Sequence, residues 1–333
     1  MVKLHDFINY HWYSKKLTWL SVLLWPISLI FSAIAKIRKR AQLKVLDGQP
    51  QVSVPIIVIG NISVGGVGKT PLVETIVRHL REEGYRPGIV SRGYGGKSDI
   101  YPLDVEEHID INACGDEPYM LQQSLNCPVV VSPVRVDAVQ YMAEKHPTVD
   151  VILSDDGLQH YKMFRDIEIA VIDASRGLGN KLALPAGPLR EPESRLDEVD
   201  YVIMNGGPTD FDHGYEMQIR VGDLVHLLSG KRIEANALKE RKVHAVAGIG
   251  NPERFFISLR EFGYSVIEHA FPDHHCYVKE DFQFAEKLPI IMTHKDTVKC
   301  IQFMTDDMYY LAIDADVDIA FWEKLSADLK TLK

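Results

Sequence analysis

The sequence predicts an α/β protein with a mostly parallel sheet, a second, smaller α/β domain, and an apolar N-terminal helix that docks on a membrane. Three observations support this prediction. Continuous runs of apolar, β-branched residues alternate with helix-like stretches, as in parallel sheets covered on both faces. A glycine-rich loop, SVGGVGKTP at 63–71, follows the first of these runs. A segment without any charge, residues 17–35, precedes it.

Composition and charge narrow the classes of function. The chain has 333 residues, enough for two domains, and its four cysteines lie far apart, which favours a reducing compartment over a disulfide framework or a zinc ribbon. Residues 1–46 carry eight Lys or Arg and one acid, a charge of +7. Since the net charge of the chain is −9, the remaining residues together carry −16. A basic end on an acidic body argues against nucleic-acid binding and fits an anionic membrane surface.

The first segment, 1–46, is predicted to associate with a membrane. As a helix, residues 17–35 span roughly 28 Å, barely the hydrocarbon thickness. Pro26 would kink the helix, and Trp12, Trp19 and Trp25 favour the headgroup region. Both flanks are positive, so a helix lying in the interface is favoured. A single span, a cleaved secretory signal and a buried core helix are the alternatives; cleavage would export the glycine-rich loop.

Beyond residue 47 strands and helices alternate. The first domain is expected over 47–215 and the second over 216–333, with a weak, glycine-containing stretch at 206–230 as the boundary; the final helix could pack back on the first domain. Strands are expected at 54–61, 87–91, 128–132, 149–156, 167–174, 200–205, 265–270, 289–293 and 308–314, with 242–255 opening the second domain. Helices are expected from Lys69 to about Glu83, near 117–125, at 134–146 and at 317–330.

The loop at 63–71 is nearly the phosphate-binding pattern G-x-x-x-x-G-K-[ST], with Ser63 in place of the first glycine. It supplies converging backbone N–H groups at a helix N-terminus, Lys69 for the β- and γ-phosphates, and Thr70 for Mg²⁺. The replaced glycine removes none of these donors, so we predict a P-loop NTPase-like domain that binds ATP; a glycine-rich turn with an incidental Lys-Thr is the alternative. The residues expected to bind ATP are Ser63, Val64, Gly65, Gly66, Val67, Gly68, Lys69 and Thr70.

Two acids end a later strand. In VILSDDGLQH, residues 151–160, an apolar run leads to Asp155 and Asp156, as in a Walker-B strand that holds Mg²⁺. An Asp-Gly turn is the structural alternative. In CGDEPYM, residues 114–120, Asp116 is either a helix N-cap or the group that accepts the proton of an attacking hydroxyl.

Histidines and arginines complete the candidates. PDHHCY, residues 272–277, places His274 and His275 on a loop; adjacent residues rarely converge on one metal ion, so a histidine paired with a carboxylate is favoured. Arginines at strand ends are suited to clamp a phosphorylated substrate. Candidates of this kind are Arg92 and Arg135, with Tyr94 in the same SRGYGG loop as Arg92, and the proline-rich LPAGPLREP segment presents Arg190 and Glu191. Each could equally belong to an ordinary turn.

The order of these motifs resembles one family. GNISVGGVGKTP, SRGYGG, GDEP, SDDGLQH, LPAGPLREP, PDHH and THKDTVK occur in sequence between residues 60 and 299, after the apolar N-terminal segment. Each is weak alone, whereas seven in order are specific. The combination resembles the tetraacyldisaccharide 4'-kinase (lipid A 4'-kinase) family, whose phosphate loop is itself nonstandard.

The resemblance implies an activity and roles for the residues. It implies ATP-dependent phosphorylation of the 4'-hydroxyl of tetraacyldisaccharide 1-phosphate, a lipid A precursor, at the cytoplasmic face of the Gram-negative inner membrane. It implies that Asp116 is the base and His274 assists it, and that Lys69 and Thr70 bind ATP and Mg²⁺. The metal and phosphate site would be completed by Asp155, Asp156, His160 and Glu191, and the substrate would be contacted by Arg92 and Arg135.

The expected partners are a lipid substrate held in the bilayer and the inner-membrane surface, with neither nucleic acid nor an obligate protein partner. Because the phosphate loop and His274 lie in different predicted domains, closure of the domains is expected to assemble the site and exclude water. The competing function is a membrane-associated P-loop NTPase switch that acts on a protein partner. Partitioning ATPases with GGVGKT have a lysine where this chain has Val64, which argues against that class, as does a second domain with its own candidate catalytic loop.

Overall fold

The chain divides into two units, which together contain the predicted strands. The first unit comprises Met1–Arg92, Ser132–Gln218 and Asp316–Lys333, and the second Gly93–Val131 and Ile219–Ala315. The structure is a computed structural model that describes residues 4–14, 16–46, 48, 51–106, 109–239, 241–250, 252–273 and 275–332.

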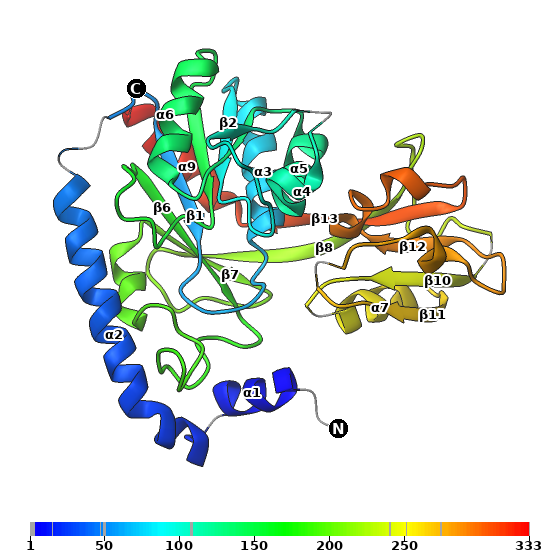
Figure 1. The fold of residues 1–333 in the computed structure, drawn as a ribbon, viewed down its shortest axis with the longest axis horizontal. Helices are drawn as coiled ribbons and strands as arrows, with labels where there is room; N and C mark the ends of the chain where they lie inside the picture. The colour runs from blue at the N-terminus through cyan, green and yellow to red at the C-terminus, as the bar shows by residue number, and fades with distance from the viewer. Residues whose placement is uncertain are drawn as a thin grey trace. The chain divides into compact units, whose positions relative to one another are not determined.

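The first unit is built on a parallel sheet. Its strands are β1 (Ile56–Gly60), β2 (Pro87–Ser91), β5 (Val151–Asp155), β6 (Ile167–Asp173), β7 (Tyr201–Asn205) and the start of β8 (Gly214–His226). Their order is β8-β7-β6-β1-β5-β2, and every described pair is parallel (Figure 1). All residues of β1, β2 and β5 are buried, which is why these strands appear in the sequence as continuous apolar runs. The predicted fold class is confirmed.

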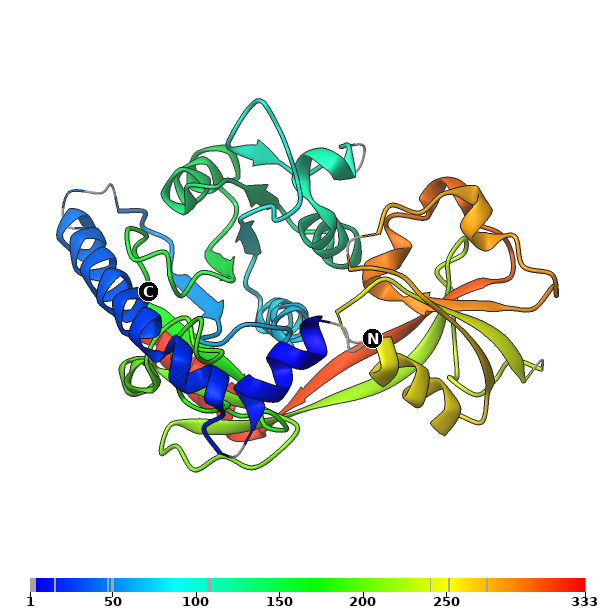
Figure 2. The ribbon, with the colours of Figure 1, turned by 60° about the horizontal axis from the view of Figure 1, so that its bottom comes forward.

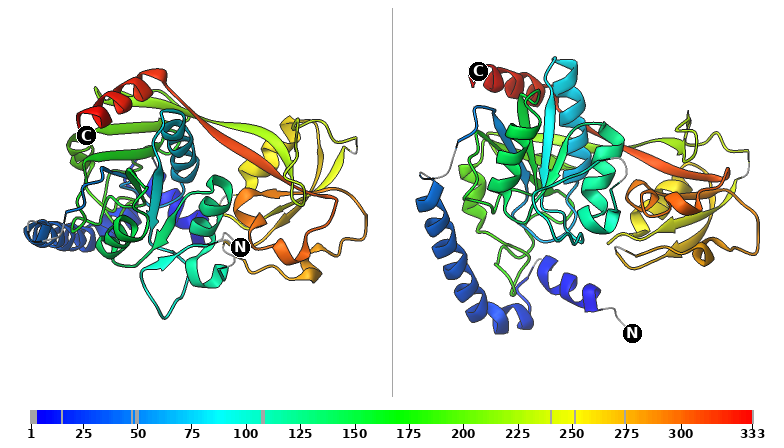
Figure 3. Two further views of the ribbon diagram at one scale, coloured as in Figure 1. Left: turned by 90° about the horizontal axis from the view of Figure 1, so that it is seen from above. Right: turned by 45° about the horizontal axis from the view of Figure 1, so that its top comes forward.

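Helices pack on this sheet. They are α3 (Lys69–Glu82), α6 (Arg135–Lys145) and α9 (Ile319–Thr331), with a 3-10 helix, η1 (Glu193–Glu198). The C-terminal helix α9 buries Phe321, Leu325 and Leu329, which share one face at a spacing of four. It lies beside α3 (Figure 3). The ring centroids of His79 in α3 and Trp322 in α9 are 4.3 Å apart. The end of the chain therefore belongs to the first unit.

Helix α2 (Trp19–Leu46) buries polar residues and exposes apolar ones. Of its described residues only Ser21 and Ser28 are buried, two turns apart on one side, and Ser28 Oγ donates to the Ala183 carbonyl at 2.7 Å. Large apolar side chains face away from the protein, among them Trp19 at 67% and Leu23 at 64% exposure. Figures 1 and 2 show α2 along the flank of the first unit.

This burial pattern excludes one of the alternatives for the N-terminal segment. A buried core helix is wrong, because the most apolar window of α2 is only 11% buried. The helix is also longer than the predicted 17–35: it continues through Pro26 and takes up the basic stretch to Leu46. By length and composition α2 could cross a membrane.

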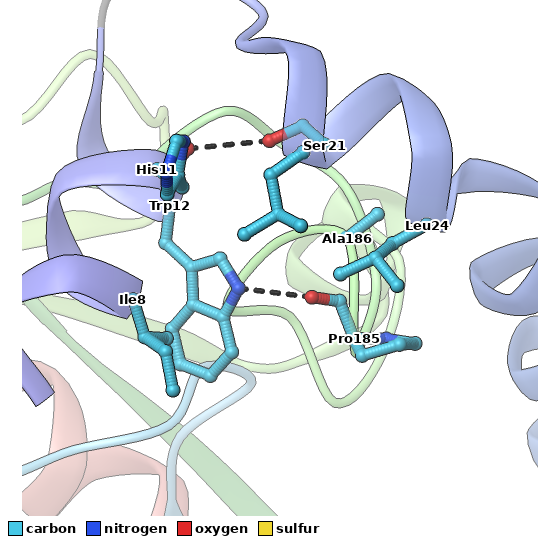
Figure 4. Close-up of a pocket in the computed structure, with 8 residues that line it drawn as sticks. Ile8, His11, Trp12, Ser21, Leu24, Pro185 and Ala186 are labelled. Carbon is cyan, nitrogen blue, oxygen red and sulfur yellow. Dashed lines mark hydrogen bonds between the residues drawn. The ribbon is translucent and has the colours of Figure 1, made fainter. Parts of the chain in front are cut away.

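A shorter helix, α1 (Leu4–Tyr13), precedes α2 and is held by hydrogen bonds to α2 and to the segment at Pro185. Trp12 Nε1 donates to the Pro185 carbonyl at 3.0 Å, and Ser21 Oγ donates to the His11 carbonyl at 3.3 Å (Figure 4). A small, mainly apolar pocket of about 140 Å³ lies between the two helices and residues 185–186. Trp12, expected at the headgroup level, is thus anchored on the protein.

The second unit contains four neighbouring parallel strands, in the order β11-β10-β12-β13. These strands are β10 (Lys242–Ala247), β11 (Ser265–Ala270), β12 (Ile290–Thr293) and β13 (Met308–Val317), with α7 (Pro252–Glu261) between β10 and β11. Smaller elements are β3 (Leu103–Asp104), α4 (Ile111–Cys114), α5 (Asp116–Leu125), β4 (Val129–Val131), β9 (Arg232–Ile233), η2 (Lys279–Phe282), α8 (His294–Thr297) and η3 (Ile301–Phe303). The predicted strands of the second domain are confirmed.

The stretch 206–230, expected to be a weak domain boundary, contains a strand. β8 runs through it for 13 residues, and its exposure alternates, with Met217 buried and Gln218 exposed. Alternation of this kind lacks the continuous apolar run by which the other strands were predicted. Residues 93–131, expected in the first domain, group with 219–315, because α5 packs on α8. A contact between segments so far apart in sequence has no local signal.

A buried ion network braces the first unit. Arg195 is 2% exposed and pairs with Glu168 at 2.5 Å, while Arg165 pairs with the same carboxylate at 2.6 Å. Arg195 Nε also donates to the hydroxyl of Tyr161 at 2.9 Å. Burial alone would raise the pKa of Glu168, but the two arginines more than offset it, so the pKa lies below its ordinary value.

Replacing Arg195 with Met should destabilise the first unit strongly, by about 3–5 kcal/mol in the free energy of unfolding, because it removes one partner of a buried charge pair. The control is Arg86→Met: its pair with Asp150 is largely exposed and is worth less than about 1 kcal/mol. Because the folded pKa of Glu168 is depressed, the wild-type advantage should be complete above about pH 4.3 and decline as the pH falls through the lower folded value. Denaturant titrations at pH 7 and pH 3 measure both effects. Equal losses in the two variants would contradict the network's importance.

Candidate active site

The phosphate loop makes a sharp turn between β1 and α3 that only glycines permit. Gly68 is the N-cap of α3 at φ 94°, and a Cβ there would lie 2.6 Å from Asn205 Nδ2. Gly65 has φ 111°. A Cβ on Gly66 would meet no atom within 4 Å, and α3 has no side-chain cap. The loop therefore offers backbone N–H groups and the positive end of a helix to an anion.

Two asparagines at the ends of parallel strands hold this loop. Asn61, fully buried after β1, donates to the Ser63 carbonyl at 2.6 Å and accepts from Lys69 Nζ at 3.1 Å. Asn205, the last residue of β7, donates to the Val67 carbonyl at 3.0 Å. Lys69, the residue expected to contact phosphate, is thus held by a hydrogen bond to the buried Asn61.

The proline-rich segment 184–192 packs against the start of the loop. Ser63 forms an antiparallel bridge with Leu189, and the Val64 N–H donates to the Pro188 carbonyl at 2.9 Å. Ser63 is 5% exposed, so the residue that replaces the usual glycine has a buried, strand-like place. Thr70 begins α3 next to Lys69 and is partly exposed.

The two acids after β5 differ in environment. Asp155 is buried at 4% exposure, whereas Asp156 adopts φ 49° and carries a partly exposed side chain. Asp156 pairs with Lys69 at 3.3 Å and with Arg190 at 3.5 Å. Burial would raise the pKa of Asp156, but the charges of Lys69 and Arg190 lower it by more than burial raises it. The pKa therefore lies below its ordinary value, and the carboxylate is ionised at neutral pH. The structure thus brings together Lys69, Asp156 and Arg190.

Magnesium fits this donor set. Among the described residues, no group of three or more His, Cys, Asp or Glu side chains is arranged to hold a metal ion. Mg²⁺ bound with a nucleotide needs only one or two carboxylates, because phosphates and waters supply the other ligands. Asp155 and Asp156 beside the phosphate loop satisfy that requirement.

Glu191 has a different environment from the one expected. It is 7% exposed; Gln159 Nε2 donates to one of its oxygens at 2.8 Å, and the Tyr161 hydroxyl donates to the other. Gln159 Nε2 is also 3.0 Å from the Asn61 carbonyl. Burial and Glu191 raise the pKa of Tyr161, which therefore remains a donor. Glu191 thus braces the strand end that carries the phosphate loop, and both its oxygens are engaged by protein groups.

Arg135 is buried and His160 is partly buried in the first unit. Arg135 is 2% exposed and donates to the carbonyls of Ser132 and Asp155, each at 3.0 Å. Burial, Arg135 and Arg92 lower the pKa of His160 to about 4, so its imidazole is neutral at pH 7. Arg92, in contrast, is exposed at the end of β2.

Asp116 belongs to the second unit and begins α5. Gly115, at φ 90°, is the N-cap of α5, so Asp116 is not the cap of this helix. Its carboxylate is 15% exposed and lies 3.5 Å from Lys299 Nζ. The SRGYGG loop packs on the junction between α4 and α5, where a Cβ on Gly96 would lie 2.6 Å from the Ala113 carbonyl oxygen. Tyr94 of the same loop is 68% exposed.

His274, the predicted partner of Asp116, lies outside the described residues. The adjacent His275 pairs with Asp281 at 3.0 Å, a contact within its own loop. Lys295 of α8 pairs with Glu117 at 3.3 Å and with Asp273 at 3.4 Å.

Sequence reasoning missed the residues that hold the site in place. Asn61 and Asn205 each end an apolar run, a position where polar residues of parallel strands gather, and this signal could have found them. Arg176 donates to the Gly66 carbonyl and pairs with Asp173 at 3.1 Å. Lys299 ends the THKDTVK motif, to which no role was assigned. Neither of these two had a local signal.

Comparisons with known proteins agree with the geometry. Residues 20–330 match the family model described as tetraacyldisaccharide-1-P 4'-kinase. The chain is 44% identical over 316 residues to the tetraacyldisaccharide 4'-kinase of Hahella chejuensis, covering 93% of each chain. It is 45% identical over 322 residues to that of Methylobacillus flagellatus, covering 96% of this chain and 95% of the other. The crystal structure of LpxK from Aquifex aeolicus in complex with ATP superposes with a TM-score of 0.80 at 30% identity, over 94% of this chain and 99% of that one. The protein therefore belongs to the tetraacyldisaccharide 4'-kinase family.

Proposed function

We propose that this protein is an ATP-dependent kinase that transfers the γ-phosphate to the 4'-hydroxyl of tetraacyldisaccharide 1-phosphate, giving the 1,4'-bisphosphate. The observation that carries the proposal is the phosphate loop with Lys69 held between Asn61 and Asp156, in a chain of this family. A membrane-associated NTPase switch is not favoured, because every relative compared above is a lipid A precursor kinase.

Lys69 has a counter-charge that phosphate can replace. At 3.3 Å, Asp156 balances the ammonium group of Lys69. When ATP binds, its β- and γ-phosphates replace Asp156 as the ion-pair partners of Lys69. Asp156 then becomes available as a metal ligand. Thr70, Asp155 and Asp156 are the residues that would hold Mg²⁺; Glu191 is omitted because Gln159 and Tyr161 engage its oxygens. Mg²⁺, when bound, neutralises charge on the transferred phosphate.

Asp116 is the proposed proton acceptor. Phosphoryl transfer passes through a loose transition state, so the acceptor hydroxyl loses its proton late, and positioning supplies most of the rate. A carboxylate in reach of the acceptor hydroxyl suits this task, and the Asp116 carboxylate lies 3.5 Å from Lys299 Nζ. His274 is proposed to assist. Exposed Arg92 and Tyr94 are proposed to meet the substrate.

The lipid substrate and the cytoplasmic face of the inner membrane are the proposed partners of α2. The helix contacts the first unit at Ser28 and again at Lys39, whose ammonium group pairs with Glu198. A spanning helix would bury these residues in hydrocarbon together with the polar surface that they touch, which costs several kcal/mol per unsatisfied group. A helix lying in the interface keeps these contacts and buries the apolar face.

The function is tested by incubating the pure protein with ATP and tetraacyldisaccharide 1-phosphate in mixed micelles. Formation of the 1,4'-bisphosphate supports the proposal; ATP hydrolysis without that product would favour the NTPase switch.

Lys69→Ala should lower kcat by about 10²–10³-fold, because it removes a charged donor from the transferring phosphates. The fold should persist, since Asp156 keeps its pair with Arg190. Lys162→Ala, an exposed lysine of the same unit, is the control. Rates of product formation and circular dichroism check the expectation. Wild-type turnover in Lys69→Ala would end the kinase proposal.

Asp116→Asn should lower kcat by about 10²–10⁴-fold with little change in the KM for ATP, because the amide cannot accept the proton. Helix capping is not at issue, since Gly115 is the N-cap. Glu117→Gln, at the neighbouring carboxylate, should keep nearly full activity. Steady-state kinetics distinguish the two variants, and near-normal turnover in Asp116→Asn would remove it from the mechanism. His274→Ala should behave like Asp116→Asn if the two act as a unit.

Ile30→Glu should weaken binding to anionic vesicles at least about tenfold, because it places a charge on the outward apolar face of α2, where Ile30 is 61% exposed. Gln42→Glu adds the same charge near the end of the helix and is the control. Vesicle cosedimentation measures the difference, and the free energy of unfolding should not change. Protease access to residues 4–13 from the periplasmic side would show instead that the helix crosses.

A further inference from the structure

A mostly buried cluster in the second unit includes Asp116, the proposed proton acceptor. It consists of Asp116, Lys299, Asp296 and Tyr277 and is called the Lys299 cluster. Lys299 Nζ lies 3.5 Å from Asp116 Oδ2 and 3.1 Å from Asp296 Oδ1. Lys299 is 7% exposed and Asp296 is fully buried. Lys299 and Asp296 both come from the THKDTVK motif, residues 293–299, to which the sequence analysis gave no function.

Asp296 is a fixed anchor. Its Oδ2 accepts from the Gly248 backbone N–H at 2.9 Å and from Thr293 Oγ1 at 2.5 Å, which leaves Oδ1 for Lys299. A Cβ on Gly248 would lie 2.9 Å from Asp296 Oδ1, so only glycine lets the backbone approach this closely. A buried carboxylate with both oxygens engaged has little freedom to move.

Lys299 is therefore held at its charged end. The Tyr277 ring lies 5.4 Å from Nζ, close enough for a cation–π contact. Burial and Asp296 raise the pKa of Tyr277, so its ring stays neutral. Asp296 and the Tyr277 ring therefore hold the ammonium group at a place 3.5 Å from the Asp116 carboxylate.

Two carboxylates on one ammonium group suit a proton acceptor. When Asp116 takes the proton of the attacking hydroxyl, it loses its negative charge, while Lys299 stays paired with Asp296. No buried charge is then left without a partner, a situation that would cost several kcal/mol. A single Asp116–Lys299 pair would incur that cost in every turnover.

We propose that Lys299, anchored by Asp296, is a positioning residue that orients the Asp116 carboxylate and balances its charge before proton transfer. This inference rests on the proposed role of Asp116. Lys299 itself touches no reacting atom: the O–H bond of the acceptor breaks, the new O–H bond forms on Asp116, and the proton leaves to water after the product departs.

The test compares Lys299→Met, which keeps the length of the side chain and removes its charge, with Lys299→Arg, which keeps the charge. Lys299→Met should lower kcat by about 10²-fold or more with KM for both substrates changed less than about threefold. Lys299→Arg should recover at least about tenfold of the loss. Lys295→Met is the matched control from the same motif, because Lys295 pairs with Glu117 and Asp273; its kcat should stay within about threefold of wild type.

A second comparison separates this inference from the proposed function. If Lys299 acts through Asp116, adding Lys299→Met to Asp116→Asn should lower kcat by less than about threefold further. Independent, multiplying losses would overturn the positioning role, as would normal kcat in Lys299→Met while Asp116→Asn is impaired. Full activity in Asp116→Asn would instead overturn the role of Asp116, and absence of bisphosphate product with wild type would overturn the function.

Folding is controlled separately. Lys299→Met leaves Asp296 buried without its counter-charge, so the variant could fail to fold. In that case Lys299→Met with Asp296→Asn removes both charges together and is compared in the same way. Circular dichroism and the thermal midpoint show that each assayed variant is folded; a loss of kcat that vanishes when rates are corrected for the folded fraction would reduce Lys299 to a structural role and overturn the proposal.

Discussion

The first unit depends on one constraint of parallel sheets: the carboxyl ends of all strands lie at the same edge. β1, β5 and β7 therefore deliver Asn61, the two acids and Asn205 to one place, where they surround the phosphate loop. Asn61 fixes both the loop backbone and Lys69, and Asp156 balances the lysine charge. The edge supplies charge compensation before any phosphate arrives. Because these groups are fixed by buried strands, little reorganisation is needed when an anion binds.

Helix α2 has its polar and apolar faces placed in an unusual way. Its serines face the protein and its large apolar side chains face away, the reverse of a helix in a soluble core. Apolar surface of this extent is stable only against another apolar medium, and the basic residues at its C-terminal half favour an anionic one. The exposed apolar face of α2 on the flank of the first unit therefore supports the proposal that the enzyme acts on a substrate held in a membrane.

Buried charge in this protein is concentrated next to the groups proposed to act. The Glu168–Arg195 network leads through Tyr161 to Glu191 and the strand end before the phosphate loop. In the second unit the Lys299 cluster leads to Asp116. Such clusters contribute little net stability compared with apolar packing, but they fix the orientation of polar groups. Both clusters therefore support the proposal that the groups next to them are held rigidly for phosphoryl transfer.

The sequence by itself determined the fold class, nearly every strand, and the phosphate loop with its acids, because each has a local pattern: an apolar run, a glycine spacing, or an acid at a strand end. It also determined the family, from seven motifs in order. Only the tertiary structure showed that residues 93–131 group with 219–315, that β8 crosses the expected boundary, and that Arg135 and Glu191 are engaged by protein groups. It alone placed Lys299 beside Asp116, 183 residues apart in the chain. Such contacts follow from strand order and helix packing, which depend on the whole chain and leave no periodicity in any one segment.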